Sequence, residues 1–168
     1  MGKVLLRVAG LALVAMVAAC SSGGNMKVLS SAPVAGLPAQ PTLRLVVNPV
    51  DKDSDEVLAD VRSSLLGQLQ ATGYYSKVVV TQENTDLVMT VDITKYAKVT
   101  VGERLLVGAL AGRNRVGTQV KIVQSSSNTT IKSFEAAGES AAHPLSSESG
   151  ISDAVREVVK QISSAAVI

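Results

Sequence analysis

An alternation of apolar and polar side chains over residues 86–96, DLVMTVDITKY, constrains the fold more than any other feature of the chain. One side of this segment carries four apolar residues, Leu87, Met89, Val91 and Ile93. The residues between them are mostly polar. Because successive side chains of a β-strand point to opposite faces, the pattern predicts a sheet with one buried face and one face in contact with water.

Other segments complete the predicted elements. Short β-rich runs predict four further strands at 42–48 (TLRLVVN), 77–81 (KVVVT), 116–124 (VGTQVKIVQ) and 129–136 (TTIKSFEA). Two segments instead carry apolar residues at helical spacing. The first spans 51–73, with Gly73 as its expected C-cap. The second spans 149–168 and has an apolar stripe made of Ile151, Ala154, Val155, Val158, Val159 and Ile162.

The order of these elements, β-α-β-β-β-β-α, predicts the architecture. Two amphipathic helices can bury one face of a sheet of this size. We therefore expect an α/β (α+β) two-layer sandwich, in which a mixed sheet of about five strands carries both helices on one face.

The first twenty residues have the layout of an export signal. Lys3 and Arg7 precede an apolar run at 8–19, which is shorter than the about 20 residues that a membrane-spanning helix needs. Val17-Ala18-Ala19-Cys20 resembles the bacterial lipobox, in which the cysteine becomes the lipidated first residue. Lipidation would also explain why an exported chain has a single cysteine. The alternative is an ordinary signal peptide that happens to contain a cysteine.

This resemblance implies a membrane anchor. We expect residues 1–19 to be a cleaved signal peptide, 20–41 a lipidated and flexible tether, and 42–168 one periplasmic α/β domain. As a flexible coil of about 20 residues, the tether would span about 25 Å. Acylated Cys20 would hold the protein on a membrane without crossing it. Ser21 stands where aspartate retains enterobacterial lipoproteins at the inner membrane, so the analogy favours the periplasmic face of the outer membrane.

The charge of the chain argues against a nucleic-acid partner. The whole chain has 16 basic and 14 acidic residues, and removal of Lys3 and Arg7 with the signal peptide leaves 14 of each. Proteins that bind nucleic acids carry clustered basic surface. The chain also has no tryptophan and only one phenylalanine, so few side chains could stack on bases.

The segment 102–117, GERLLVGALAGRNRVG, allows two interpretations. Its glycine spacing fits neither a Walker A loop nor a dinucleotide fingerprint. It is either a short connection packed across one end of the sheet, with glycines that permit close approach, or a basic patch. The patch would consist of Arg104, Arg113 and Arg115, because arginine binds phosphates and carboxylates in bidentate fashion. Its target would be lipid phosphate, lipopolysaccharide or an acidic partner.

No pattern predicts catalysis, a cofactor or a metal site. His143 is the only histidine. GESAA at 138–142 lacks the second glycine of the nucleophile elbow G-x-S-x-G. The acidic run 51–55 begins like a calcium loop, but Glu56 and Arg62 stand where that loop requires glycine and glutamate. We therefore expect a protein that is not an enzyme.

Three segments, LVMTVDITKY, GERLLVGALAG and GTQVKIV, resemble the core of a family of small bacterial outer-membrane lipoproteins that share a domain of unknown function. In that family a strand ending in tyrosine leads to a Gly-x-Arg segment, a glycine-rich apolar stretch and another strand. The similarity covers about Asp86 to Ala137. After Val123 the chain departs from it, because QSSSNTT lacks the acidic residue and the glycine of the family's turn.

These observations lead to two functional hypotheses. The leading one is a non-enzymatic envelope lipoprotein that binds or helps assemble another cell-envelope component through protein contacts. The alternative is a ligand-binding lipoprotein that contacts lipid, lipopolysaccharide or glycan through the arginine patch. Both hypotheses need an envelope partner or ligand and a lipid anchor at Cys20.

Overall fold

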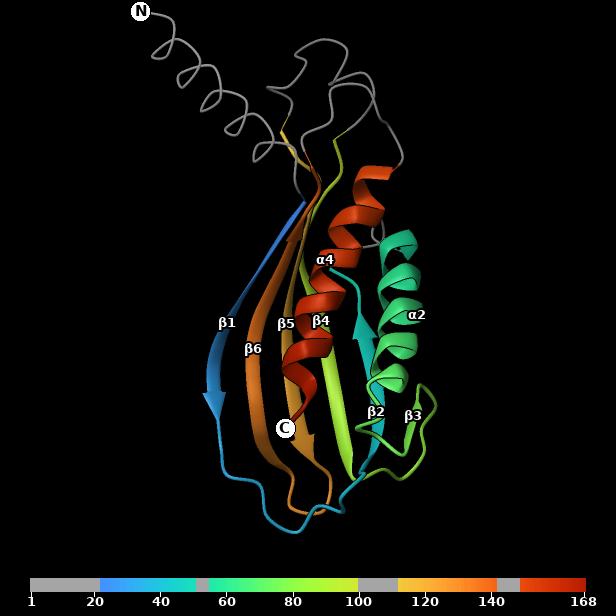
Figure 1. Ribbon diagram of the computed structural model, residues 1–168, viewed down its shortest axis with the longest axis vertical. Helices are drawn as coiled ribbons and strands as arrows, with labels where there is room; N and C mark the ends of the chain where they lie inside the picture. Colours follow the sequence, from blue (N-terminus) through green and yellow to red (C-terminus); the bar gives the residue numbers. More distant parts are fainter. Residues whose placement is uncertain (1–21, 51–54, 100–111, 142–148) are drawn as a thin grey trace, which may run out of the picture.

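The computed structural model describes residues 22–50, 55–99, 112–141 and 149–168. They form a sheet and two helices, as Figure 1 shows. The strands are β1 (Gly23–Ser31), β2 (Thr42–Asn48), β3 (Lys77–Val79), β4 (Leu87–Ala97), β5 (Arg115–Gln124) and β6 (Thr129–Glu139). The helices are α2 (Asp55–Ala71) and α4 (Ser149–Ala166).

The sheet is mixed and open. Its strand order is β1-β6-β5-β4-β2-β3. Strand β2 pairs in parallel with both β3 and β4, whereas the remaining neighbours pair antiparallel. Helix α2 makes the connection that returns the chain from β2 to its parallel neighbours, as parallel strands require.

Both helices lie side by side on one face of the sheet (Figure 1). Helix α4 packs on β6, β5 and β1, and α2 packs on β2 and β3. The predicted stripe of α4 is buried, and so are the four alternating apolar residues of β4. The expected two-layer α+β architecture is thus confirmed. Neither described helix combines the length and the apolar character needed to cross a membrane.

Strand β1 corrects two expectations. It raises the number of strands to six, and it occupies residues that were expected to belong to a flexible tether. It pairs antiparallel with β6, from Gly23 opposite Glu139 to Ser31 opposite Lys132. All nine residues of β1 are exposed. Because backbone pairing rather than a buried face holds this edge strand, its sequence carries no alternation that could predict it. Residues 1–21, including Cys20, lie outside the described part.

The second face of the sheet carries charged and polar side chains together with several valines, and neither described helix covers it. On β2, Leu43 and Leu45 are buried under the helices, so Arg44 between them points to the opposite side. The same alternation places Lys121 of β5 on this face, between buried Val120 and Ile122. The sheet therefore has the one dry and one wet face that the alternation predicted.

Candidate binding surfaces

Two of the three predicted arginines meet around one carboxylate. Arg115 Nε lies 3.0 Å from Glu139 Oε1, and Arg113 Nη1 lies 3.8 Å from Oε2 of the same residue. The register of β5 and β6 explains this, because Arg115 and Glu139 are direct partners. Arg104 lies outside the described residues. The arrangement forms a basic cluster of Arg113, Arg115 and Glu139 at one end of the sheet.

A buried polar pair fixes that end of the sheet. The Ser140 backbone N–H donates to the Asn114 carbonyl at 3.0 Å, and the Asn114 N–H donates to Ser140 Oγ at 3.1 Å. Asn114 Oδ1 accepts a further bond from the Val99 N–H at 2.7 Å. Both side chains are fully buried. The serine of GESAA therefore joins the end of β6 to the start of β5, and Asn114 extends the link to Val99 after β4, a role that the sequence motif did not indicate.

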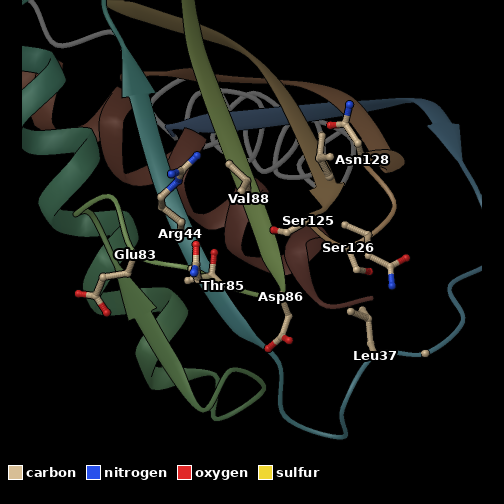
Figure 2. A pocket seen from close by; sticks show the side chains of 13 residues that line it. Leu37, Arg44, Glu83, Thr85, Asp86, Val88, Ser125, Ser126 and Asn128 are labelled. Atoms are coloured by element: carbon tan, nitrogen blue, oxygen red, sulfur yellow. The ribbon is translucent and has the colours of Figure 1, made fainter.

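A hollow of about 720 Å³ lies at the opposite end of the strands, on the uncovered face (Figure 2). Segments distant in the sequence line it: the loop before β2, the loop before β4, and the turn between β5 and β6. Its thirteen lining residues are Gly36, Leu37, Arg44, Glu83, Asn84, Thr85, Asp86, Val88, Val123, Gln124, Ser125, Ser126 and Asn128. Sequence reasoning missed this site, because no local motif joins these segments.

Arg44 is the hollow's most unusual side chain. Its register partner on β4 is Val88, and Figure 2 shows the two side chains on neighbouring strands. Arg44 makes no hydrogen bond or ion pair with any other described residue. Its Nε is buried without a partner. A buried charged donor without an acceptor is costly, so this group calls for an explanation.

The two carboxylates of the hollow are held by other groups. Asp86 Oδ2 accepts hydrogen bonds from the backbone N–H and the hydroxyl of Thr42, both at 2.7 Å, and these bonds lower the pKa of Asp86. Glu83 Oε2 lies 2.6 Å from Lys77 Nζ, and Glu83 Oε1 accepts from Thr81 Oγ1 at 2.8 Å. Hydrogen bonds from Lys77 and Thr81 lower the pKa of Glu83. Neither carboxylate pairs with Arg44.

The outer edge of β1 is the third notable surface. It carries three exposed large apolar residues, Met26 (42%), Val28 (49%) and Leu29 (42%). Met26 and Val28 pair with buried Ala136 and Phe134 of β6. These two side chains therefore lie on the helix-covered side of the sheet, at its margin, where α4 leaves them partly uncovered.

Metal ligation finds no support in this part of the chain. No three described His, Cys, Asp or Glu side chains lie close enough together to hold a metal ion. His143 and residues 51–54 of the acidic run fall outside the described ranges, and Asp55 begins helix α2.

The fold and these surfaces define a class of protein: a two-layer α+β domain with one sheet face that the helices leave uncovered and a long exposed edge strand. The chain belongs to the family "Domain of unknown function (DUF4410)", whose model matches residues 47–144. This confirms the expected membership in a family with a domain of unknown function, and it does not bear on the lipobox. No curated protein sequence matches the chain.

Solved structures with the same fold are distant in sequence. The dodecamer of PelC from Paraburkholderia phytofirmans is 14% identical, with a TM-score of 0.56 over 83% of this chain and 95% of PelC. Protein XCC0632 from Xanthomonas campestris (DUF330) is 12% identical, with a TM-score of 0.56 over 82% of this chain and 88% of XCC0632. Lipoprotein GNA1162 from Neisseria meningitidis is 17% identical, with a TM-score of 0.41 over 74% of this chain and 96% of that protein.

Proposed function

We propose that this chain is a non-enzymatic envelope lipoprotein that binds or helps assemble another cell-envelope component through protein contacts, and that the outer edge of β1 is the contact surface. The observation that carries this proposal is the exposure of β1 at the edge of the sheet. It is an edge strand of nine residues, and every one of them is exposed.

An exposed edge strand is a template for pairing with another strand. Its outward N–H and C=O groups can form a backbone ladder with a partner, while alternate side chains supply specificity. The irregularity between Val28 and Ser30 limits a regular ladder to Gly23–Val28. Within that stretch, Met26 and Val28 offer apolar surface that a partner strand would bury. The edge therefore supplies both backbone pairing and hydrophobic contact.

The two edges of the sheet differ in a way that supports this assignment. Strand β3 at the other edge has three residues, and a short edge strand offers little to pair with. Natural proteins usually protect a long edge, yet β1 carries only one charged residue, Lys27. This asymmetry favours β1 as an edge kept open for a partner.

Two further observations support an envelope role. Val17-Ala18-Ala19-Cys20 resembles a lipobox, which predicts export and a lipid anchor. PelC has a similar fold and forms a dodecamer, so a domain of this architecture can associate with further copies of itself. The partner strand proposed for β1 would come from an envelope protein, and a second copy of this chain satisfies the same chemistry.

Site-specific photo-crosslinking in cells tests the proposal. A photoreactive amino acid would replace Val28 on β1 or, as the control, Val80 just after β3, since the two valines are almost equally exposed at 49% and 47%. We expect a discrete cross-linked product at Val28 and none at Val80. The mass of the product shows whether the partner is a second copy. Equal products at both sites, or none at Val28, would refute the assignment to β1.

The runner-up function is binding of anionic lipid or glycan through the arginine patch. The favouring observation is the convergence of Arg113 and Arg115 on Glu139, where the three groups have a formal net charge of +1. Liposomes with anionic lipid would bind an unlipidated chain starting at Ser22 in a salt-sensitive way. Replacing Arg104, Arg113 and Arg115 with serine should abolish this binding. An equal response from the variant and the parent chain would exclude the patch.

A further inference from the structure

Hydrogen bonds connect the loops that line the hollow around Arg44, which a surface depression without a function would not require. The Gln124 side chain donates to the Ala35 carbonyl at 3.1 Å, and the Ser125 N–H donates to the Asp86 carbonyl at 2.9 Å. The backbone N–H and the hydroxyl of Thr42 also donate to the Asp86 carboxylate. These bonds join the lining loops to one another, so the walls are positioned before any ligand enters.

The only cation among the lining residues is Arg44. Its guanidinium has no acceptor among the described residues, whereas the carboxylates of Glu83 and Asp86 already receive hydrogen bonds. Four further lining side chains make no hydrogen bond to another described residue: Asn84, Ser125, Ser126 and Asn128. The hollow therefore presents one unused cationic fork together with several unused hydroxyl and carboxamide groups.

We propose that this hollow binds a carboxylated sugar, with the ligand carboxylate on the guanidinium of Arg44 and its hydroxyls on the surrounding hydroxyl and amide groups. The proposal concerns a different surface from the β1 edge, because no residue of β1 lines the hollow. Its success or failure is independent of the protein-contact function proposed above.

The charge of the site selects a monoanion. Arginine binds carboxylate and phosphate well through the bidentate fork of its guanidinium. One guanidinium can balance one negative charge. The carboxylates of Asp86 and of Glu83, which is paired with Lys77, also line the hollow and repel any further negative charge. A carboxylate with one charge suits this balance better than a phosphate dianion.

The neutral groups select a sugar. Hydroxyl and carboxamide side chains both donate and accept, as the hydroxyls of a sugar ring do. Val88 and Leu37 supply apolar wall for the carbon face of a ring (Figure 2). The volume of about 720 Å³ falls within the range of about 300–1,000 Å³ that is typical of ligand pockets.

Calorimetric titration of the full-length protein in detergent tests the proposal, with D-glucuronate, D-glucose and acetate as probes. We expect D-glucuronate to bind, and D-glucose and acetate to bind at least tenfold more weakly. Equal binding of D-glucose would show that the carboxylate is not recognised. Equal binding of acetate would reduce the site to a simple anion site. Failure of D-glucuronate to saturate the protein would also overturn the proposal.

Two variants locate the site. Arg44→Gln should weaken D-glucuronate binding at least tenfold, while Lys121→Gln, on the same face but outside the hollow, should leave it unchanged. Arg44→Lys keeps the charge and loses the fork, so its affinity should lie between those of the parent and Arg44→Gln. Thermal melts of all three variants confirm folding. Unchanged affinity in folded Arg44→Gln would refute the proposal.

Discussion

At the scale of single residues, Gly138 of β6 sets how closely α4 approaches the sheet. A Cβ atom at this position would lie 2.0 Å from the Ala154 carbonyl oxygen and 2.6 Å from the Val158 nitrogen. Both atoms belong to the helix backbone, which cannot move aside as a flexible side chain would. The helix can therefore contact β6 only because this residue has no side chain.

Two glycine substitutions should have opposite effects. Gly138→Ala should lower the free energy of unfolding by about 1–3 kcal/mol or more, because it overpacks a backbone contact. Gly67→Ala should raise it by about 0.5–1 kcal/mol, since Gly67 is exposed in α2 and no atom beyond its neighbours in the helix lies within 4 Å of the position that an alanine Cβ would take. Urea denaturation of both variants measures the difference. A Gly138→Ala variant as stable as the parent would contradict the close packing of α4.

Asp86 makes stability depend on acid pH. Thr42 holds the pKa of Asp86 below its ordinary value of 3.8 in the folded protein. A depressed folded pKa contributes stability that is present above the ordinary pKa and is lost as pH falls through the folded pKa. Asp86→Asn should therefore lose less stability than the parent as the pH falls through and below the ordinary pKa of 3.8.

The control for this prediction is Thr42→Val. It removes the hydroxyl donor and keeps the backbone donor, so the pKa of Asp86 should rise part of the way toward its ordinary value. Urea unfolding at several pH values gives the free energy of unfolding as a function of pH for the parent, Asp86→Asn and Thr42→Val. If Asp86→Asn and the parent lose stability in parallel, the Asp86–Thr42 contact does not contribute to the acid response.

At the scale of elements, side chains from the sheet layer bind the C-terminal end of α4. Lys132 Nζ donates to the Ala165 carbonyl at 2.6 Å, and the Tyr75 hydroxyl donates to the Ala166 carbonyl. Burial raises the pKa of Tyr75, which keeps its hydroxyl protonated as a donor. The last carbonyls of a helix have no partner inside the helix. These contacts supply partners and attach α4 to β6 and to the segment before β3.

Tyr75→Phe tests this attachment. The change leaves the Ala166 carbonyl without its donor in a buried position, which should lower the free energy of unfolding by about 1–3 kcal/mol. Tyr74→Phe is the matched control, because the Tyr74 hydroxyl donates at 2.9 Å to the Ile168 carbonyl at a partly exposed site. It should cost less. If both variants lose the same free energy of unfolding in chemical denaturation, burial of the Tyr75 hydrogen bond does not add to its contribution to stability.

The elements that the sequence predicted share one property: each buries a regular set of side chains. The alternation of β4 and the stripe of α4 record that burial directly, so both were predicted together with their buried faces. Strand β1 buries no side chain of its own, and its pairing with β6 is not encoded locally. Local pattern reports side-chain burial, whereas strand pairing with a distant segment leaves little local trace.

The candidate sites follow the same rule. Arg113 and Arg115 are close in sequence and were predicted as a group, but their partner Glu139 became visible only through the β5–β6 register. Arg44 sits inside a run that correctly predicted a strand, and nothing local marks it as unpaired. The hollow that surrounds it is lined by loops from three distant parts of the chain, so it could not be predicted from local sequence.

At the scale of the whole molecule, the two ends of the sheet carry different surfaces. One cross-strand row joins Gly23, Glu139, Arg115 and Ala97, so β1 begins beside the basic cluster. The hollow around Arg44 lies at the other end of the strands. The ten residues of β5 separate these ends by about 30 Å.

Membrane attachment is predicted to depend on Cys20. Cys20→Ser should abolish acylation and leave uncleaved or mislocalised precursor. Membrane fractionation and the intact mass of the variant measure the two effects. A variant with the same fractionation and the same added mass as the parent would rule out lipidation at Cys20.

The early start of β1 determines how an acylated molecule would stand on its membrane. Three peptide units separate Cys20 from Gly23, and they reach about 10 Å at most, compared with about 25 Å for the coil that the sequence suggested. Such a short linker would hold the sheet with its strands pointing away from the membrane and with the basic cluster next to the lipid headgroups. The Arg44 hollow would lie at the end far from the membrane, where soluble ligands of the surrounding compartment can reach it.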